Sequence, residues 1–424
     1  MQPFKAPRSD IRSNSRSFSD LLSRARSSIV LMADGRKLID FHSDAGTLNY
    51  GHNNHQIKVA ITKYLESDAA VSAFNMNTSA KLEFMETFSS VILRQRGLQY
   101  RCQFAESVIE VAIELSRTVT GRQKIILFTH AYHGTSLRAV GASGKDRTTS
   151  GVSLSDVTFM PYDGYLGPDV DTAGYLRKVL TDESSGVDRP AAILVETVQG
   201  EGGIYVAAKE WLLSIQDIAR DVGALFIIDD VQMGCGRTGD FFSFEFAGLS
   251  PDIVVLSNSL SGYGLPLSML LIKDSIIESR SARCTSAFRG NNLALVSATA
   301  AVNLYWRTQT FSQGVHRMGT VLRSRLETIA SGCGRNFVVR GRGMALGFDC
   351  QNGNVADATT RKAFEKGLMV EQCECADQVV KFLPALTIDL ETLNQGLQIF
   401  EGALAETLNK IGFAATCPSG TLRR

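Results

Sequence analysis

Residues 191–203, AAILVETVQGEGG, and residues 224–239, ALFIIDDVQMGCGRTG, decide the fold of this chain. Each stretch begins with a short apolar run and continues into acidic residues and glycines. A run of four or five apolar residues bounded by turn residues is typical of a strand that is buried on both faces. Residues 125–128 and 253–256 have the same pattern. These runs predict parallel strands of one buried sheet.

The segments between these strands have apolar residues at helical spacing, as in residues 108–119 and 210–221. Strands that alternate with helices predict an α/β domain with a mostly parallel sheet. Ligands of such sheets lie beyond the carboxyl ends of the strands. Glu196, Asp229 and Asp230 follow two of the predicted strands, so we expect the chemistry of the chain at this edge.

The last hundred residues predict a second, smaller α/β unit, with helices over 315–329 and 390–411 and strands over 337–339 and 345–348. We therefore expect three parts: an N-terminal segment, 1–50, that joins the small domain; a large α/β domain, 51–305; and a small C-terminal domain, 306–424. The glycine clusters match neither the dinucleotide-binding nor the P-loop pattern, so nucleotide cofactors are not favoured.

Composition excludes several classes of protein. Of 424 residues, 44% are hydrophobic and 21% are charged, and the net charge is +1, which is the balance of a globular protein with a sizeable core. A near-neutral chain does not favour nucleic-acid or membrane partners. The Arg- and Ser-rich start has no apolar signal core, so we expect a cytoplasmic protein. The eight cysteines have no paired CxxC spacing, which predicts reduced thiols and no metal site.

Several further motifs carry a resemblance to a known family. They are GTLNYGH (46–52), YHG (132–134), ETVQGEGG (196–203), DDVQ (229–232), GCGRTG (234–239), FRGNN (288–292) and LP (383–384). Together they resemble the class III (fold type I) pyridoxal-phosphate aminotransferases, most closely the diaminobutyrate aminotransferases of ectoine-type pathways. The resemblance implies an α/β fold type I architecture, with a seven-stranded, mostly parallel sheet sandwiched by helices and a smaller α/β domain. It also implies a homodimer.

The resemblance assigns roles to three residues around the cofactor ring. The aromatic residue matching Tyr132 stacks on the pyridine ring. The aspartate matching Asp229 pairs with the protonated ring nitrogen and keeps the ring an electron sink. The glutamine matching Gln232 binds the ring hydroxyl.

Three departures from the family pattern decide what we expect of the chemistry. The family has a Schiff-base lysine where this chain has Asn258, and a carboxamide is neither a nucleophilic amine nor a base. The family's Gly-Thr or Gly-Ser phosphate pair is replaced by Ala105, Glu106 and Ser107, and Glu106 would repel a phosphate. Ser286 and Ala287 stand where the family places a threonine that reaches the partner's phosphate.

We therefore expect no cofactor, with Tyr132, Asp229, Gln232, Ser107 and Ser286 as vestigial cofactor positions; pyridoxal phosphate is expected only if that site still binds. The leading hypothesis is an enzyme independent of pyridoxal phosphate that performs acid/base chemistry, such as condensation, cyclisation or dehydration, on an amino-acid-like amine. Its catalytic residues are predicted to be Glu106, Asp229, His133 and Asn258, and its substrate-binding residues Tyr132, Gln232, Glu201 and Asp230.

Two other functions remain open at this point. The chain is a non-catalytic partner of an active homologue or a ligand sensor, or it is a residual aminotransferase that binds pyridoxal or pyridoxamine phosphate without a covalent bond.

Overall fold

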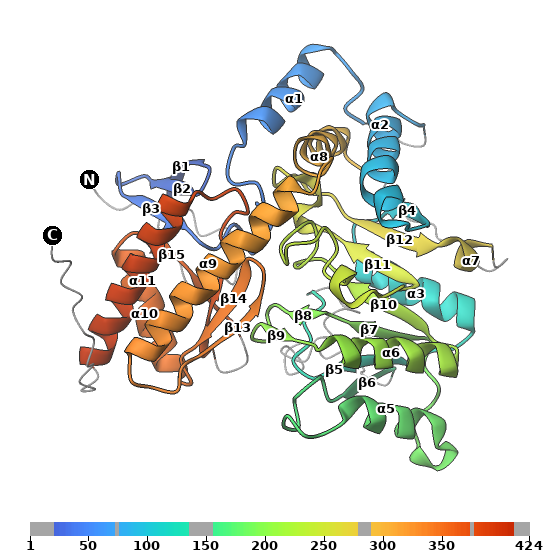
Figure 1. The fold of residues 1–424 in the computed structure, drawn as a ribbon. Coiled ribbons are helices and arrows are strands. Elements are labelled where there is room, and N and C mark those ends of the chain that lie inside the picture. Colours follow the sequence, from blue (N-terminus) through green and yellow to red (C-terminus); the bar gives the residue numbers. More distant parts are fainter. Residues whose placement is uncertain (1–20, 73–75, 135–155, 279–289, 374–376, 411–424) are drawn as a thin grey trace, which may run out of the picture.

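The computed structural model describes residues 21–72, 76–134, 156–278, 290–373 and 377–410 (Figure 1). Its centre is a seven-stranded sheet with the order β4-β12-β11-β10-β7-β5-β6, in which β12 alone runs antiparallel to both neighbours. The strands are β4 (Tyr100–Phe104), β5 (Ile125–Phe128), β6 (Val157–Met160), β7 (Ala192–Val195), β10 (Leu225–Asp229), β11 (Ile253–Leu256) and β12 (Met269–Lys273). The predicted mostly parallel sheet and its four predicted strands are confirmed, with ends shifted by one residue in two of them.

The central strands are apolar throughout because both faces of the sheet are covered. Successive residues of one strand point to opposite faces of the sheet. Ile126 and Ile193 therefore contribute to one core, while Ile125 and Leu194 contribute to the other. Helix α3 (Val108–Thr120) packs on the second face, and α6 (Lys209–Val222) packs on the first with α5 (Thr172–Thr181) beside it. Helices α3 and α6 end at left-handed glycines, which allow the last carbonyl groups of a helix to be hydrogen-bonded, and α5 ends at Asp182.

A second group of helices lies at the upper side of this sheet in Figure 1. Helix α8 packs against both α1 and α2, and a π-helical turn, Phe88–Leu93, continues α2 into the core. The bounds are α1 (His55–Glu66), α2 (Ser79–Thr87) and α8 (Asn292–Tyr305), while the short helix α7 (Asp274–Ile277) directly follows β12. None of the described helices is long and apolar enough to cross a bilayer.

The smaller domain has its own four-stranded antiparallel sheet, in the order β13-β14-β17-β16, with three helices packed around its apolar core. Its elements are α9 (Thr310–Gly332), β13 (Val338–Arg342), β14 (Ala345–Asp349), α10 (Gly353–Glu365), β16 (Glu371–Cys373), β17 (Val379–Phe382) and α11 (Leu390–Lys410). The predicted helices and strands of this unit are present, and Ile411 lies outside the described residues.

The beginning of the chain forms a sheet with a strand from near its end. The strands β1 (Leu22–Arg26), β2 (Ile29–Met32) and β3 (Lys37–Asp40) are antiparallel neighbours, and β3 pairs in parallel with β15 (Leu368–Met369). After β3, the residues Ser43, Asp44 and Ala45 have φ values of 47°, 50° and 53°. Left-handed backbone costs about 1–2 kcal/mol per non-glycine residue. This strained turn leads the chain to the large domain.

Candidate active site

The candidate site lies at the carboxyl ends of three adjacent parallel strands, β5, β7 and β10. Because these strands are neighbours in the sheet, the residues that follow them meet at one edge. Tyr132 and His133 follow β5, Glu196 follows β7, and Asp229 ends β10. These side chains therefore gather at the carboxyl edge of the sheet, where the sequence predicted the site.

His133 and Asp229 form a buried pair. The Nδ1 atom of His133 lies 2.6 Å from Oδ2 of Asp229, and Oδ1 of Asp229 accepts the backbone N–H of Val231 at 3.1 Å. Burial acts to lower the pKa of His133, but the hydrogen bond and charge of Asp229 outweigh it, so this pKa lies above its ordinary value. The pair holds one proton between a ring nitrogen and a carboxylate.

The carboxyl group of Glu196 is a second proton-carrying group beside this pair. Its Oε2 atom accepts the backbone N–H of Tyr132 at 3.3 Å, which ties the end of β7 to the segment after β5. Burial, partly opposed by the charge of His133, raises the pKa of Glu196 to about 8. Glu196 is therefore mostly protonated at neutral pH. The sequence marked Glu196 as an acid at a strand end, but it was not among the predicted site residues.

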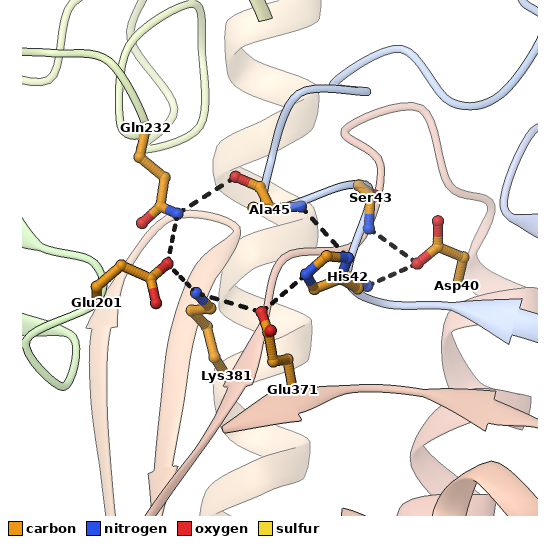
Figure 2. A network of polar contacts seen from close by, with 8 residues as sticks. All are labelled: Asp40, His42, Ser43, Ala45, Glu201, Gln232, Glu371 and Lys381. Carbon is orange, nitrogen blue, oxygen red and sulfur yellow. Dashed lines mark hydrogen bonds and ion pairs between the residues drawn. The ribbon is translucent and has the colours of Figure 1, made fainter. Parts of the chain in front are cut away.

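Gln232 and Glu201 meet at the side of the site that faces the small domain (Figure 2). The Nε2 atom of Gln232 donates to Oε1 of Glu201 at 3.0 Å and to the carbonyl of Ala45 at 3.3 Å. Glu201 in turn accepts a hydrogen bond from Lys381 of β17. Lys381 is 1% exposed, and no sequence motif marked it as a site residue.

Asp230 points elsewhere. Its Oδ2 atom accepts the backbone N–H of Ser243 at 3.0 Å, and the residue is 1% exposed. Burial raises its pKa to about 7. Within the described part of the chain no contact joins its carboxylate to Glu201 or Gln232, although the sequence predicted all three as substrate-binding residues. Asp230 therefore holds the backbone at Ser243 in place.

The opposite side of the site is the junction of β4 and α3. Only Ala105, Glu106 and Ser107 connect the strand to the helix, and the connection has no glycine. Glu106 is exposed, and Ser107 begins the helix without a side-chain capping bond. No contact among the described residues brings Glu106 to Asp229 or His133, with which it was predicted to act.

Asn258 begins a short 3-10 helix, Asn258–Ser261, directly after β11 and Ser257. Its φ of 52° is in the left-handed region, which asparagine tolerates better than most residues. The residue is half-buried, and its neighbour Ser257 shares a 2.7 Å hydrogen bond with Ser268. The predicted position Ser286 lies outside the described residues.

A search of protein-family models matches residues 11–404 to "Aminotransferase class-III". The chain belongs to this family. The class III family uses pyridoxal phosphate. The predicted family and the fold type I architecture, with a mixed seven-stranded sheet and a smaller domain, are thereby confirmed.

Relatives of similar length match almost end to end. An "Uncharacterized aminotransferase y4qG" of Sinorhizobium fredii is 49% identical over 96% of this chain and 92% of the relative. A "Diaminobutyrate--2-oxoglutarate transaminase" of Bordetella parapertussis is 46% identical over 96% and 95%. The crystal structure of a Bacillus anthracis aminotransferase superimposes with a TM-score of 0.83 over 94% of this chain and 96% of that one, at 21% identity, which supports the fold alone.

The residues present fit only one half of the family's cofactor. On the ring side, Asp229 offers a carboxylate, Tyr132 an aromatic face, and Gln232 a buried Oε1 atom with no hydrogen-bond partner among the described residues. On the other side, position 258 has no amine, and the exposed carboxylate of Glu106 stands just before the N-terminus of α3. An anion at that helix end opposes a phosphate. The donor set does not fit a covalently held pyridoxal phosphate.

Proposed function

We propose that this chain has kept the aminotransferase fold but not transamination, and that it transfers protons to and from an amine-bearing small molecule without pyridoxal phosphate. The observation that carries this proposal is the buried pair of His133 and Asp229 beside the buried Glu196, whose pKa burial raises. A buried carboxyl group that can donate a proton and a histidine–aspartate pair that can accept one are the acid and the base that general acid–base catalysis requires.

The chemistry assigned to the cluster is condensation or ring closure with loss of water. Glu196 donates one proton to the oxygen that leaves. The His133–Asp229 pair takes a proton from the attacking amine and passes it to the same oxygen, which then leaves as water. Tyr132 borders the cluster through its backbone contact to Glu196, and we assign its ring the role of covering the ligand. Asn258 contributes a polar carboxamide and takes no part in proton transfer.

Loss of transamination is tested with added pyridoxal phosphate, diaminobutyrate and 2-oxoglutarate. We expect dialysed protein to keep no cofactor chromophore and to form no glutamate above the enzyme-free rate. A matched double variant, Asn258→Lys with Glu106→Ser, restores an amine and removes the opposing carboxylate. This variant should retain the cofactor after dialysis, and borohydride should then attach the cofactor to the chain permanently. Glutamate formation by the unaltered protein would refute the proposal.

The proton-transfer role is tested with N-acylated diamines, whose ring closure forms one C–N bond and releases one water. Nuclear magnetic resonance follows the closure with the unaltered protein, Glu196→Gln and His133→Gln. We expect turnover by the unaltered protein and a loss of about 100-fold in each variant. Equal rates in all three proteins would contradict the assignment, and binding without turnover would favour a ligand sensor.

We also propose that the chain is a homodimer. Helices α1 and α2 expose Val59, Leu65 and Leu82, each at least half exposed, at the side of the molecule where both helices pack on α8. Light scattering coupled to gel filtration should give twice the chain mass, and a monomer at micromolar concentration would refute this part of the proposal.

A further inference from the structure

Ser243 lies where the large domain meets the small domain, and its polar groups contact both. Its backbone N–H donates to Oδ2 of Asp230 at 3.0 Å, and its Oγ atom accepts the hydroxyl of Thr197 at 2.5 Å. Its carbonyl accepts a hydrogen bond from Nη1 of Arg342, at the end of β13, at 2.8 Å. Ser243, Asp230 and Thr197 are all buried. One buried residue is therefore hydrogen-bonded to the small domain and to the segments that follow β7 and β10.

The two contacts within the large domain involve the chain neighbours of the proposed acid and base. Thr197 directly follows Glu196, and Asp230 directly follows Asp229. The carbonyl of Glu196 also accepts the hydroxyl of Tyr162 at 2.7 Å, so the chain after β7 is held at two consecutive residues. A misplacement of about 1 Å in a reacting group can cost about 100-fold in rate. These hydrogen bonds therefore bear directly on the proposed chemistry.

The small domain is seated on the segment that carries this serine. Besides its bond to the serine carbonyl, the guanidinium of Arg342 lies 3.3 Å from Oδ2 of Asp240, and its Cζ atom is 3.7 Å from the centre of the Phe246 ring. The next residue, Gly343, packs on the large domain so closely that a Cβ atom there would lie 2.5 Å from the backbone carbonyl carbon of Thr238. The position of β13 therefore fixes this segment of the large domain.

Loss of the bond between the two hydroxyl groups would loosen the end of β7. Both groups are buried, so bulk water does not replace a missing partner, and the group left behind must move or admit water. Burial is the largest cause of the raised pKa of Glu196, whose carboxyl group is faced by His133, Asp229 and Glu201. If water enters, the effect of burial weakens and this pKa falls towards its ordinary value.

We propose that Ser243 is a positioning residue: through Thr197 and Asp230 it fixes the proposed acid and base relative to the small domain. This inference rests on the proposed function, because it explains how the acid and the base are held at the distance that the reaction needs. It predicts that the hydroxyl bond between Ser243 and Thr197 affects the site although both side chains are buried.

The decisive comparison is Thr197→Val with Thr197→Ser. Valine keeps the branched shape of the side chain without its hydroxyl, whereas serine keeps the hydroxyl and loses one methyl group. In the ring closure of N-acylated diamines, we expect kcat to fall at least about 10-fold in Thr197→Val, with KM unchanged within about twofold. Thr197→Ser should keep kcat within about twofold.

The partner side of the same bond gives a second comparison. Ser243→Ala removes the acceptor and should act like Thr197→Val. The double variant should lose no more activity than either single variant, because both changes remove one and the same interaction.

Urea unfolding follows the effect without turnover. Each protein is compared at each pH with the same protein carrying Glu196→Gln. In the unaltered background the stability gained by Glu196→Gln rises with pH and levels off near the pKa of Glu196, at about 8. In Thr197→Val and Ser243→Ala this levelling pH should be about 1 pH unit lower. A merely structural loss would lower the stability at every pH and leave the levelling pH unchanged.

The link to the small domain is tested with Arg342→Met, which keeps an unbranched side chain beside Phe246 but removes the hydrogen bond and the charge. It should lower kcat several-fold and lower the levelling pH. Arg361→Met, the same change in an exposed ion pair with Asp357 on α10, should change neither value.

An unchanged levelling pH in Thr197→Val and Ser243→Ala, equal effects of Thr197→Val and Thr197→Ser, or equal effects of Arg342→Met and Arg361→Met would overturn the inference. Failure of the proposed function is read separately. Absence of turnover by the unaltered protein refutes that function, while the levelling pH still decides whether Ser243 positions Glu196.

Discussion

The two sides of the candidate site differ in how firmly their side chains are held. On the β7–β10 side, His133, Asp229 and Glu196 are buried and tied to one another or to backbone groups. On the β4–β11 side, Glu106 is exposed and Asn258 is half-buried at a left-handed turn. The difference teaches that side chains packed in the sheet core are fixed by their burial, whereas side chains on the connecting loops can change without disturbing the packing.

The sharpest test of this contrast removes the carboxylate from the buried side. Asp229→Ala leaves His133 buried without its acceptor, so we expect a loss of about 3–5 kcal/mol in the free energy of unfolding. Urea denaturation measures it. Adding His133→Gln to this variant should recover part of the loss, since the two residues interact directly. A loss below about 1 kcal/mol would remove the distinction between the two sides.

A smaller effect is expected from Glu196→Gln, and it depends on pH. Because the pKa of Glu196 is about 8 in the folded chain and 4.5 in the reference state, the folded protein binds more protons between these values. Its stability therefore falls as the pH rises through this window. The variant lacks this loss, so it should be more stable than the unaltered protein by about 1–3 kcal/mol above pH 8. Identical pH profiles in thermal unfolding would count against a buried, protonated Glu196.

At Asn258 the expected effect comes from the backbone. Asn258→Ala should cost about 1 kcal/mol, because alanine is less tolerant of the left-handed region. Asn258→Gly should change the stability by only a few tenths of a kcal/mol. Chemical denaturation of the two variants side by side tests this, and equal losses would show that the carboxamide itself, rather than the turn, matters for stability.

The smallest effect is expected at Glu106. Since its side chain is exposed, Glu106→Gln should change the free energy of unfolding by less than about 0.5 kcal/mol. The same variant should bind inorganic phosphate more tightly, because it removes a like charge from the connection just before α3. A large loss of stability would show that Glu106 has a structural role at this helix end.

The predictable parts of the fold are the elements that depend on short patterns of neighbouring residues. The apolar runs at 125–128 and 253–256 gave strands with the observed ends, since a strand buried on both faces has no polar residues. Asp229 and His133 were predicted together, and they form a pair. Lys381 was not predicted, because its meaning comes from Glu201, which is 180 residues away in the chain. Glu106 was grouped with the buried acids on its type alone, and exposure could not be deduced from the sequence.

The pairing of β3 with β15 has a consequence for the order in which the chain folds during synthesis. The sheet of β1–β3 is completed only when Leu368 and Met369 have left the ribosome. At about 5–20 residues per second, the roughly 330 intervening residues take on the order of half a minute. The strands of the large domain emerge complete well before that moment. The outer edge of nascent β3 therefore lacks its partner strand until the small domain has been synthesised.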